Sequence, residues 1–155
     1  MQHVYLFDIM EKRDCVRVGQ TLSFTHLQVR SGYSFFNSTI TIDKLVERAY
    51  ELGFHSLALT DENVLYGAIS FYNACKKRNI KPILGIIVSI KEGDDNTPII
   101  LLAENNDGYR QLMSLSSLIQ QNSDHSVNIE TFKNFNKDNI ITILPVETSP
   151  LRTLF

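Results

Sequence analysis

The chain has little of what marks a secreted, membrane-spanning or nucleic-acid-coating protein. It holds only two cysteines, Cys15 and Cys75, with no CxxC pair, which excludes a disulfide framework and favours a reducing, cytoplasmic location. No apolar run is long enough to span a membrane, and no basic start followed by an apolar stretch indicates a signal peptide. The formal net charge is −2, so no basic excess predicts nucleic-acid binding by the chain itself.

Apolar periodicity from residue 24 onward predicts strands and helices in alternation. The predicted strands are 24–29, 56–60, 82–90, 99–103 and 139–144. The predicted helices are 41–52, 64–78, 107–120 and a short one at 129–135, and residues 92–97 are predicted as a polar turn. The second helix is predicted to bury one face, formed by Leu65, Ala68, Ile69, Tyr72 and Cys75. The alternation predicts an α/β fold with a mainly parallel sheet.

Ligands of such sheets bind at the carboxyl ends of the strands, so the residues there are the candidates for chemistry. These residues are Arg30-Ser31, Thr60-Asp61-Glu62-Asn63 and 85–88. Asp61 has an acid–base interpretation, but a carboxylate in this position more often orients a turn or caps the next helix. The tyrosines are interpreted as packing residues with a polar tip rather than as a platform for stacked bases; they are Tyr33, Tyr66, Tyr72 and Tyr109.

Three stretches of sequence, in this order and at this spacing, point to a known family. They read FTHLQVRSGYSFFNS, LVERAYELGFHSLALTDENVLYGAISFYNACKKRNIKPILG and IILLAENNDGYRQLMSLSS. They resemble the PHP (polymerase and histidinol phosphatase) domain, above all the one that opens the alpha subunit of DNA polymerase III in low-GC Gram-positive bacteria. The resemblance covers nearly everything from residue 24 to 117. It implies a partial PHP-type distorted (β/α)7 barrel, of which the predicted strands supply only part.

The resemblance also implies where metal ligands would lie, and this chain departs from each position. Metal-binding members carry a His-x-His motif on a strand, where alternation turns both imidazoles to one face. The six vestigial positions in this chain are Gln28, Arg30, Asn37, Glu62, Ile87 and Pro98. They stand where such members have, in order, histidine, histidine, aspartate, histidine, glutamate and histidine. Only Glu62 keeps a good ligating group, because an amide is a poor ligand and a guanidinium has no free lone pair.

These replacements predict no tightly bound zinc, manganese or magnesium and no phosphoesterase activity, because that chemistry needs clustered metal ions. No catalytic residue, cofactor site or metal site is therefore assigned. Two uses of the pocket stay open. Arg30 and Glu62 would form an ion pair that replaces the metal as a link between strand ends, and if buried, losing one partner would cost on the order of several kcal/mol. Alternatively, Arg30 would bind a phosphate or nucleotide.

The resemblance implies a scaffolding role in a replicative DNA polymerase. Residues 22–155 would be the N-terminal portion of a PHP domain, C-terminally incomplete, with the remainder of the alpha subunit as its first partner. Through that parent it would meet primer–template DNA, the sliding clamp and other replisome proteins. The aspartates that hold magnesium for nucleotidyl transfer belong to later parts of the family, so this chain is expected to need no cofactor of its own. The alternatives are an active PHP phosphoesterase or 3′-5′ exonuclease, and a phosphate- or nucleotide-binding module.

Residues 1–21 show little periodicity, and the resemblance begins at Leu22. Leucine can be encoded by TTG, an alternative bacterial start codon, so translation is expected to begin at Leu22, with a genuine short extension as the alternative. An open barrel leaves strand edges unpaired, and the isolated polypeptide is therefore expected to be marginally stable or prone to aggregate. A sharp cooperative unfolding transition of a monodisperse monomer would contradict that expectation.

Overall fold

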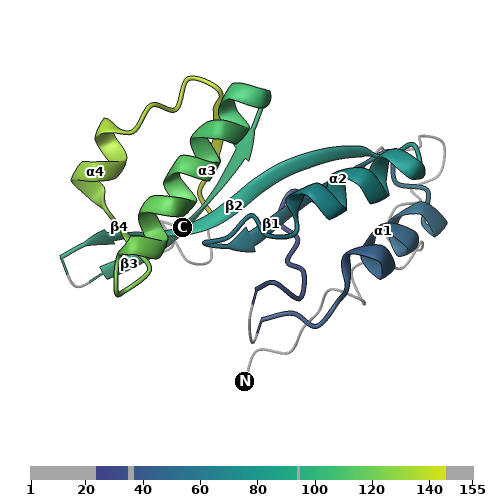
Figure 1. The fold of residues 1–155 in the computed structure, drawn as a ribbon, viewed down its shortest axis with the longest axis horizontal. Helices are drawn as coiled ribbons and strands as arrows, with labels where there is room; N and C mark the ends of the chain where they lie inside the picture. The colour runs from purple at the N-terminus through teal and green to yellow at the C-terminus, as the bar shows by residue number, and fades with distance from the viewer. Residues whose placement is uncertain (1–23, 35–36, 94, 146–155) are drawn as a thin grey trace, which may run out of the picture.

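The computed structural model describes residues 24–34, 37–93 and 95–145, so the expectations for residues 1–21 lie outside the described residues. The elements in chain order are α1 (Ile42–Glu51), β1 (Ser56–Glu62), α2 (Ala68–Lys77), β2 (Lys81–Glu92), β3 (Asp95–Ala103), α3 (Asn106–Gln121), β4 (Val127–Asn128), α4 (Ile129–Asn134) and β5 (Ile140–Ile143) (Figure 1). The predicted α/β class is confirmed. Within the described ranges, no helix has both the length and the apolar character that crossing a bilayer requires.

The strands form one mixed sheet in the order β1-β2-β3-β5, with β4 paired to the far end of β2. The expected parallel pairing holds between β1 and β2 and between β2 and β4. It does not hold for β3, which runs antiparallel to both β2 and β5. The reason is the short link between Glu92 and Asp95, which makes a hairpin because a parallel crossover needs a much longer connection. The polar turn is therefore tighter than the predicted 92–97, with Gly93 in the left-handed region at φ +62°.

The prediction of a regular strand over residues 24–29 is wrong. The segment runs beside β1 in the parallel direction, with Ala58 N–H donating to the His26 carbonyl at 3.0 Å and Thr60 N–H to the Val29 carbonyl at 2.7 Å. Three residues on one side thus match two on the other, a bulge that interrupts the ladder. The Thr60 hydroxyl fixes this bulge, because it accepts from Val29 N–H at 2.9 Å and donates to the Val29 carbonyl at 3.1 Å.

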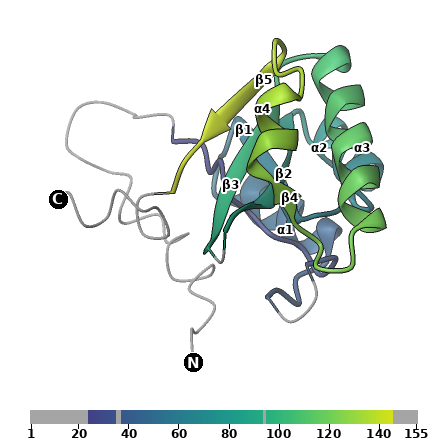
Figure 2. The ribbon, with the colours of Figure 1, turned by 90° about the vertical axis from the view of Figure 1, so that its left-hand side faces the viewer.

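The helices lie on one face of the sheet, as Figure 2 shows, and they cover two separate hydrophobic clusters. The first lies under α1 and α2 and includes Leu45, Leu57 and Phe71, all fully buried. Cys75 belongs to it, as predicted for a core residue, and burial raises the pKa of its thiol to about 12. The second lies under α3 and includes Ile86, Val88 and Leu112, which are also fully buried. Alternation along β1 and β2 sends these side chains toward the helices.

The predicted buried face of the second helix is only partly correct. Ala68 and Cys75 are buried as expected, and Phe71 joins them, but Ile69 is 62% exposed and Tyr72 is 42% exposed. The helix also begins at Ala68 rather than at residue 64, after a bend at Asn63, whose φ of 61° is left-handed. Its buried residues are Ala68, Phe71 and Cys75, which lie at helical spacing on one face. The exposure of Tyr72, with Tyr66 at 63%, exceeds what the packing interpretation of the tyrosines predicted.

The other face of the sheet carries a small apolar cluster of Ile87, Ile100 and Leu102, each 3% exposed. The strand β5 borders this face and pairs with β3 on one side only, within the part of the chain that the structure describes. Its Ile141 is 48% exposed. The described sheet is therefore open along β5.

His26 lies edge-on between two phenylalanine rings, with centroids 4.6 Å from Phe24 and 5.3 Å from Phe54. Burial lowers the pKa of this imidazole below its ordinary value of 6.5. The unfolded chain then binds the proton more tightly than the folded chain, so stability is complete above pH 6.5 and declines as the pH falls toward the lowered folded pKa.

We therefore expect His26→Gln to remove part of the acid sensitivity of the fold. Urea midpoints of the wild type and the variant, measured at about pH 7.5 and about pH 5, report this difference. The matched control is His55→Gln, because His55 is exposed. An equal loss of stability in all three proteins on acidification would contradict the assignment to His26.

Candidate functional site

The carboxyl end of β1 brings three of the vestigial positions together. Glu62 is the last residue of β1, and its register partner in the parallel strand β2 is Ile87. The segment before residue 31 runs parallel to β1, so Arg30 arrives at the same end of the sheet. The loop that follows returns Asn37 to this place.

The Glu62 carboxylate is bound by two donors. Nη2 of Arg30 lies 2.8 Å from Oε1, and Nδ2 of Asn37 donates to Oε2 at 2.7 Å. The ion pair that the sequence suggested between Arg30 and Glu62 is confirmed. Because each carboxylate oxygen has its own donor, a guanidinium and an amide stand where a metal ion would need free oxygen atoms.

This ion pair is more exposed than a buried pair, with 32% of the Arg30 side chain and 34% of the Glu62 side chain accessible. Solvent screening therefore reduces its contribution, and the loss expected on removing one partner falls below that of a buried pair. We predict a coupling of about 0.5–1 kcal/mol in a double-mutant cycle of Arg30→Ala and Glu62→Ala, measured by urea unfolding.

The pair Arg110–Asp107 on α3 provides the control for that cycle, because its side chains are 72% and 69% exposed. Its coupling is expected to be about 0.3 kcal/mol, as for exposed pairs three residues apart on a helix. Equal couplings for the two pairs would show that the Arg30–Glu62 link adds nothing beyond a surface contact.

Asp61 fastens the turn that carries these groups. Its side chain is 1% exposed and accepts three hydrogen bonds of 2.7 Å, from Ser31 N–H, the Ser31 hydroxyl and the Ser34 hydroxyl. The Ser34 hydroxyl oxygen in turn accepts from Glu62 N–H at 3.1 Å. The predicted turn-orienting role of Asp61 is confirmed. Its alternative, capping the next helix, is not, because the N-cap residue of α2 is Gly67 and no side-chain hydrogen bond caps that helix within the described residues.

The remaining vestigial positions add no ligand to this cluster. Gln28 is exposed, because the bulge beside β1 gives it a different setting from the half-buried Arg30. Ile87 is packed in the apolar cluster of the open sheet face. Pro98 pairs with Ser89 in a part of β3 that β5 does not reach, which is where a proline without an N–H is tolerated.

The residues present do not fit the metal cluster that the resemblance implied. Among residues 24–34, 37–93 and 95–145, no group of three or more histidine, cysteine, aspartate or glutamate side chains is placed to hold a metal ion. Glu62 is the one good ligand of the vestigial set, and a cation already occupies one of its oxygens. A metal-activated water and a phosphate clamp need several such groups around one ion.

Sequence reasoning assigned no role to three residues that organise this site, although Ser31 and Asn63 stood among the candidates at the strand ends. Ser31 and Ser34 both bind Asp61, and the Ser-x-x-Ser spacing after a strand was the available signal. Asn63 adopts φ 61° directly after β1. Asparagine tolerates the left-handed region better than most other non-glycine residues, which suits Asn63 to this bend.

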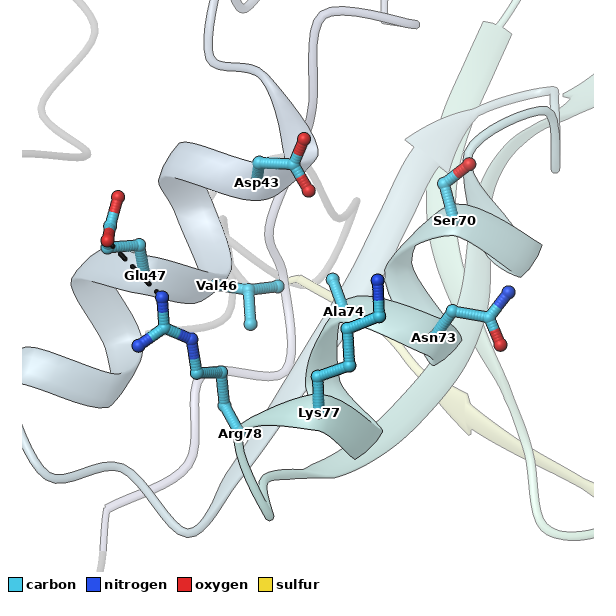
Figure 3. Close-up of a pocket in the computed structure, with 8 residues that line it drawn as sticks. All are labelled: Asp43, Val46, Glu47, Ser70, Asn73, Ala74, Lys77 and Arg78. Carbon is cyan, nitrogen blue, oxygen red and sulfur yellow. Dashed lines mark hydrogen bonds and ion pairs between the residues drawn. The ribbon is translucent and has the colours of Figure 1, made fainter.

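A polar pocket of about 500 Å³ lies between α1 and α2 (Figure 3). Nη2 of Arg78 lies 3.3 Å from Oε1 of Glu47 across it, and Asp43 and Lys77 add one further charge of each sign. The lining offers Ser70 as its one hydroxyl, without a hydrogen-bonded base that would activate it. The balanced charges and the missing base indicate a solvated groove between helices rather than a catalytic pocket.

The sequence is similar to one family and to a consistent set of curated proteins. A sequence model described as the PHP domain matches residues 26–150. DNA polymerase III subunit alpha of Bacillus subtilis is 43% identical over 136 residues, which cover 86% of this chain and 12% of that protein. The subunit of the same name from Staphylococcus aureus is 39% identical over 116 residues, covering 75% of this chain and 11% of that protein. This chain thus spans only about an eighth of the length of the relatives it matches.

Two solved structures share the fold. A protein of Bifidobacterium adolescentis provisionally assigned as a metal-dependent phosphoesterase has a TM-score of 0.52 at 18% identity, and the match covers 63% of this chain and 33% of that chain. An amidohydrolase of Chromobacterium violaceum, with bound sulfate and no metal, has a TM-score of 0.52 at 25% identity, and the match covers 62% and 33%. These likenesses confirm the expected fold, a partial barrel of strands and helices.

Proposed function

Because this chain belongs to the PHP domain family, we propose that it serves as a non-catalytic scaffold within a replicative DNA polymerase III alpha subunit. The similarity to alpha subunits over most of the chain supports the parent. The role is cytoplasmic, with primer–template DNA and the sliding clamp met through the rest of the subunit. Magnesium for nucleotidyl transfer would be held outside this chain.

The observation that carries the scaffolding role is the bonding of Glu62. Its carboxylate joins Arg30 from the bulged segment and Asn37 from the following loop. The cluster thereby links separate pieces of chain at the end of β1 without a metal ion. A site built this way resists separation of its parts but offers no water activated for hydrolysis.

Metal analysis of the purified chain tests the loss of hydrolysis. We expect less than stoichiometric zinc, manganese and magnesium after purification without chelators, and no metal-dependent release of phosphate from a phosphomonoester or of nucleotides from a DNA 3′ end. The control is the Glu62→Gln variant, which removes the last good ligand. Stoichiometric metal in the wild type that is lost in this variant, together with hydrolysis, would establish an active phosphoesterase or exonuclease instead.

The DNA sequence around the reading frame tests the parent. We expect the frame to continue into a polymerase, and the complete gene product to extend a primer on a DNA template. Arg30→Ala in that product is expected to leave the extension rate per folded molecule unchanged while lowering thermal stability. A frame that closes without polymerase sequence would contradict the proposed parent.

Two observations favour phosphate binding at the same place. Nε of Arg30 is buried and has no hydrogen-bond partner among the residues that the structure describes, and the Chromobacterium amidohydrolase holds sulfate without metal. A titration of the chain with inorganic phosphate, followed by thermal unfolding, separates the two functions. A saturable rise in melting temperature that Arg30→Ala abolishes and Arg48→Ala preserves would favour the binding module, whereas the scaffold predicts no such rise.

A further inference from the structure

An apolar groove of about 370 Å³ lies on the helix-covered face of the sheet, between α2 and α3. Ile69 and Tyr72 line it from α2, and Tyr109 lines it from α3. The strands beneath contribute Pro82, Leu84 and Ala103, and Glu104, Asn105 and Asn106 close one end. Figure 1 shows α2 and α3 at different ends of the long strand β2.

The groove follows from the topology of the sheet. A helix precedes or follows every long strand except at the β2–β3 connection, where a tight hairpin takes its place. No helix is therefore available from that connection to cover the sheet between the two hydrophobic clusters. Leu84 packs at the border of the first cluster and Ala103 at the border of the second, and both stay partly accessible.

The helix α2 presents apolar side chains to this groove at the spacing of a buried face. Ile69 and Tyr72 are three residues apart and point to the same side of the helix, yet they are 62% and 42% exposed. Glu104 is among the lining residues, and Lys76 lies over the ring of the lining residue Tyr72, 5.5 Å from its centroid. Contiguous apolar groups with a charged rim mark an interaction surface rather than ordinary exposed surface.

We propose that the groove receives an apolar helical segment from the remainder of the same polymerase polypeptide. This inference rests on the proposed function, under which about seven-eighths of a relative's length lies outside this chain. The volume suits a few aliphatic side chains at helical spacing rather than a whole domain. Glu104 in the lining and Lys76 beside Tyr72 would complement one basic and one acidic residue of such a segment.

Tyrosine labelling tests this docking. Tyr72 is labelled in the 155-residue chain and in the complete polymerase, with Tyr50 as the internal control, because Tyr50 is 53% exposed and does not line the groove. We expect the Tyr72 rate to fall at least about fivefold in the complete polymerase, as for side chains in an interface core, while the Tyr50 rate changes little. Equal Tyr72 rates in both proteins would overturn the proposal, and so would protection that rises with the concentration of the isolated chain, which would indicate a second copy as the occupant.

A variant pair confirms that the groove itself is responsible. Ile69→Asp in the complete polymerase is expected to restore Tyr72 labelling, whereas Met113→Asp, at another exposed apolar residue, on α3 and outside the groove, is not. Both substitutions lie on exposed positions, so the isolated chain should unfold at an unchanged urea concentration. Primer extension separates the two proposals: a polymerase that extends primers but leaves Tyr72 unprotected overturns the groove alone, and the lack of any polymerase parent overturns both.

Discussion

Replacing Asp61 with alanine is expected to lower the free energy of unfolding by about 3–5 kcal/mol. The carboxylate is buried and accepts all three of its hydrogen bonds from Ser31 and Ser34. Alanine leaves the Ser31 N–H and two hydroxyls without an acceptor in a space that water does not reach, and each buried donor left unpaired costs about 1–3 kcal/mol. Because a small domain has only about 5–15 kcal/mol of stability in total, this change removes a large share of it.

Urea unfolding followed by circular dichroism measures the loss, and two variants frame it. Asp61→Asn keeps one acceptor oxygen, and the serine hydroxyls can rotate to accept from its amide, so its loss should be about 1–2 kcal/mol. Asp43→Ala removes an exposed aspartate from the first turn of α1 and should cost about 0.5 kcal/mol through the helix dipole. If Asp61→Ala costs no more than Asp43→Ala, the three hydrogen bonds do not hold the turn.

Gly108→Ala is expected to destabilise the protein by about 3 kcal/mol, although alanine normally favours a helix by about 1 kcal/mol over glycine. A Cβ at Gly108, in the first turn of α3, would lie 2.1 Å from the Asn139 carbonyl oxygen and 3.4 Å from the Ala103 Cα. Backbone cannot yield as a side-chain tip does, so α3 must move away from the segment before β5. That movement strains two further bonds, since the Asn139 carbonyl accepts from Glu104 N–H at 3.0 Å and its side chain accepts from Asn105 at 2.9 Å.

The matched control is the same substitution at Gly32. There the nearest atom to a new Cβ is the Ile40 carbonyl oxygen at 3.5 Å, an ordinary contact. Gly32→Ala should therefore change the free energy of unfolding by no more than about 0.5 kcal/mol. Hydrogen exchange should rise most at α3 and β5 in Gly108→Ala and less in the helices around β1, and an equal response of the two variants would show that the close approach to Asn139 is not decisive.

Segments with a clear apolar periodicity were predicted well, because the residues that recur at helical or strand spacing are also the ones that the structure buries. Ile42, Leu45 and Ala49 are buried on α1, and β2 follows the β-branched run almost residue for residue. The turn between β2 and β3 was predicted to be longer than it is, because the polar residues at both ends of the predicted turn continue the pairing of the two strands. The strand over residues 24–29 failed for a reason that no period reveals, because the hydroxyl of Thr60, distant in sequence, bonds the Val29 backbone.

The sequence predicted the parts of the site that depend on the identity of single residues. It did not predict the parts that depend on the conformation of the Ser31–Ser34 turn. The pairing of Arg30 with Glu62 followed from the metal-site positions that the family resemblance assigns to both residues. The third member, Asn37, reaches Glu62 only because Asp61 fixes the Ser31–Ser34 turn. That geometry comes from three hydrogen bonds across some thirty residues of chain, and local sequence patterns carry no information about contacts of that range.

The long strand β2 belongs to both hydrophobic clusters, with Leu84 bordering the first and Ile86, Val88 and Ile90 inside the second. The two clusters share no other strand of this length, yet β2 carries backbone pairing for β1 at one end and for β3 and β4 at the other. If either cluster unfolds, the part of β2 that it holds is released. The other cluster packs against the remaining part of the same strand and is therefore weakened. The continuous backbone of β2 thus couples the two separate clusters into one cooperative unfolding unit. A destabilising change in α3 is therefore expected to reduce the order of β2 and, through it, the packing of the helices around β1.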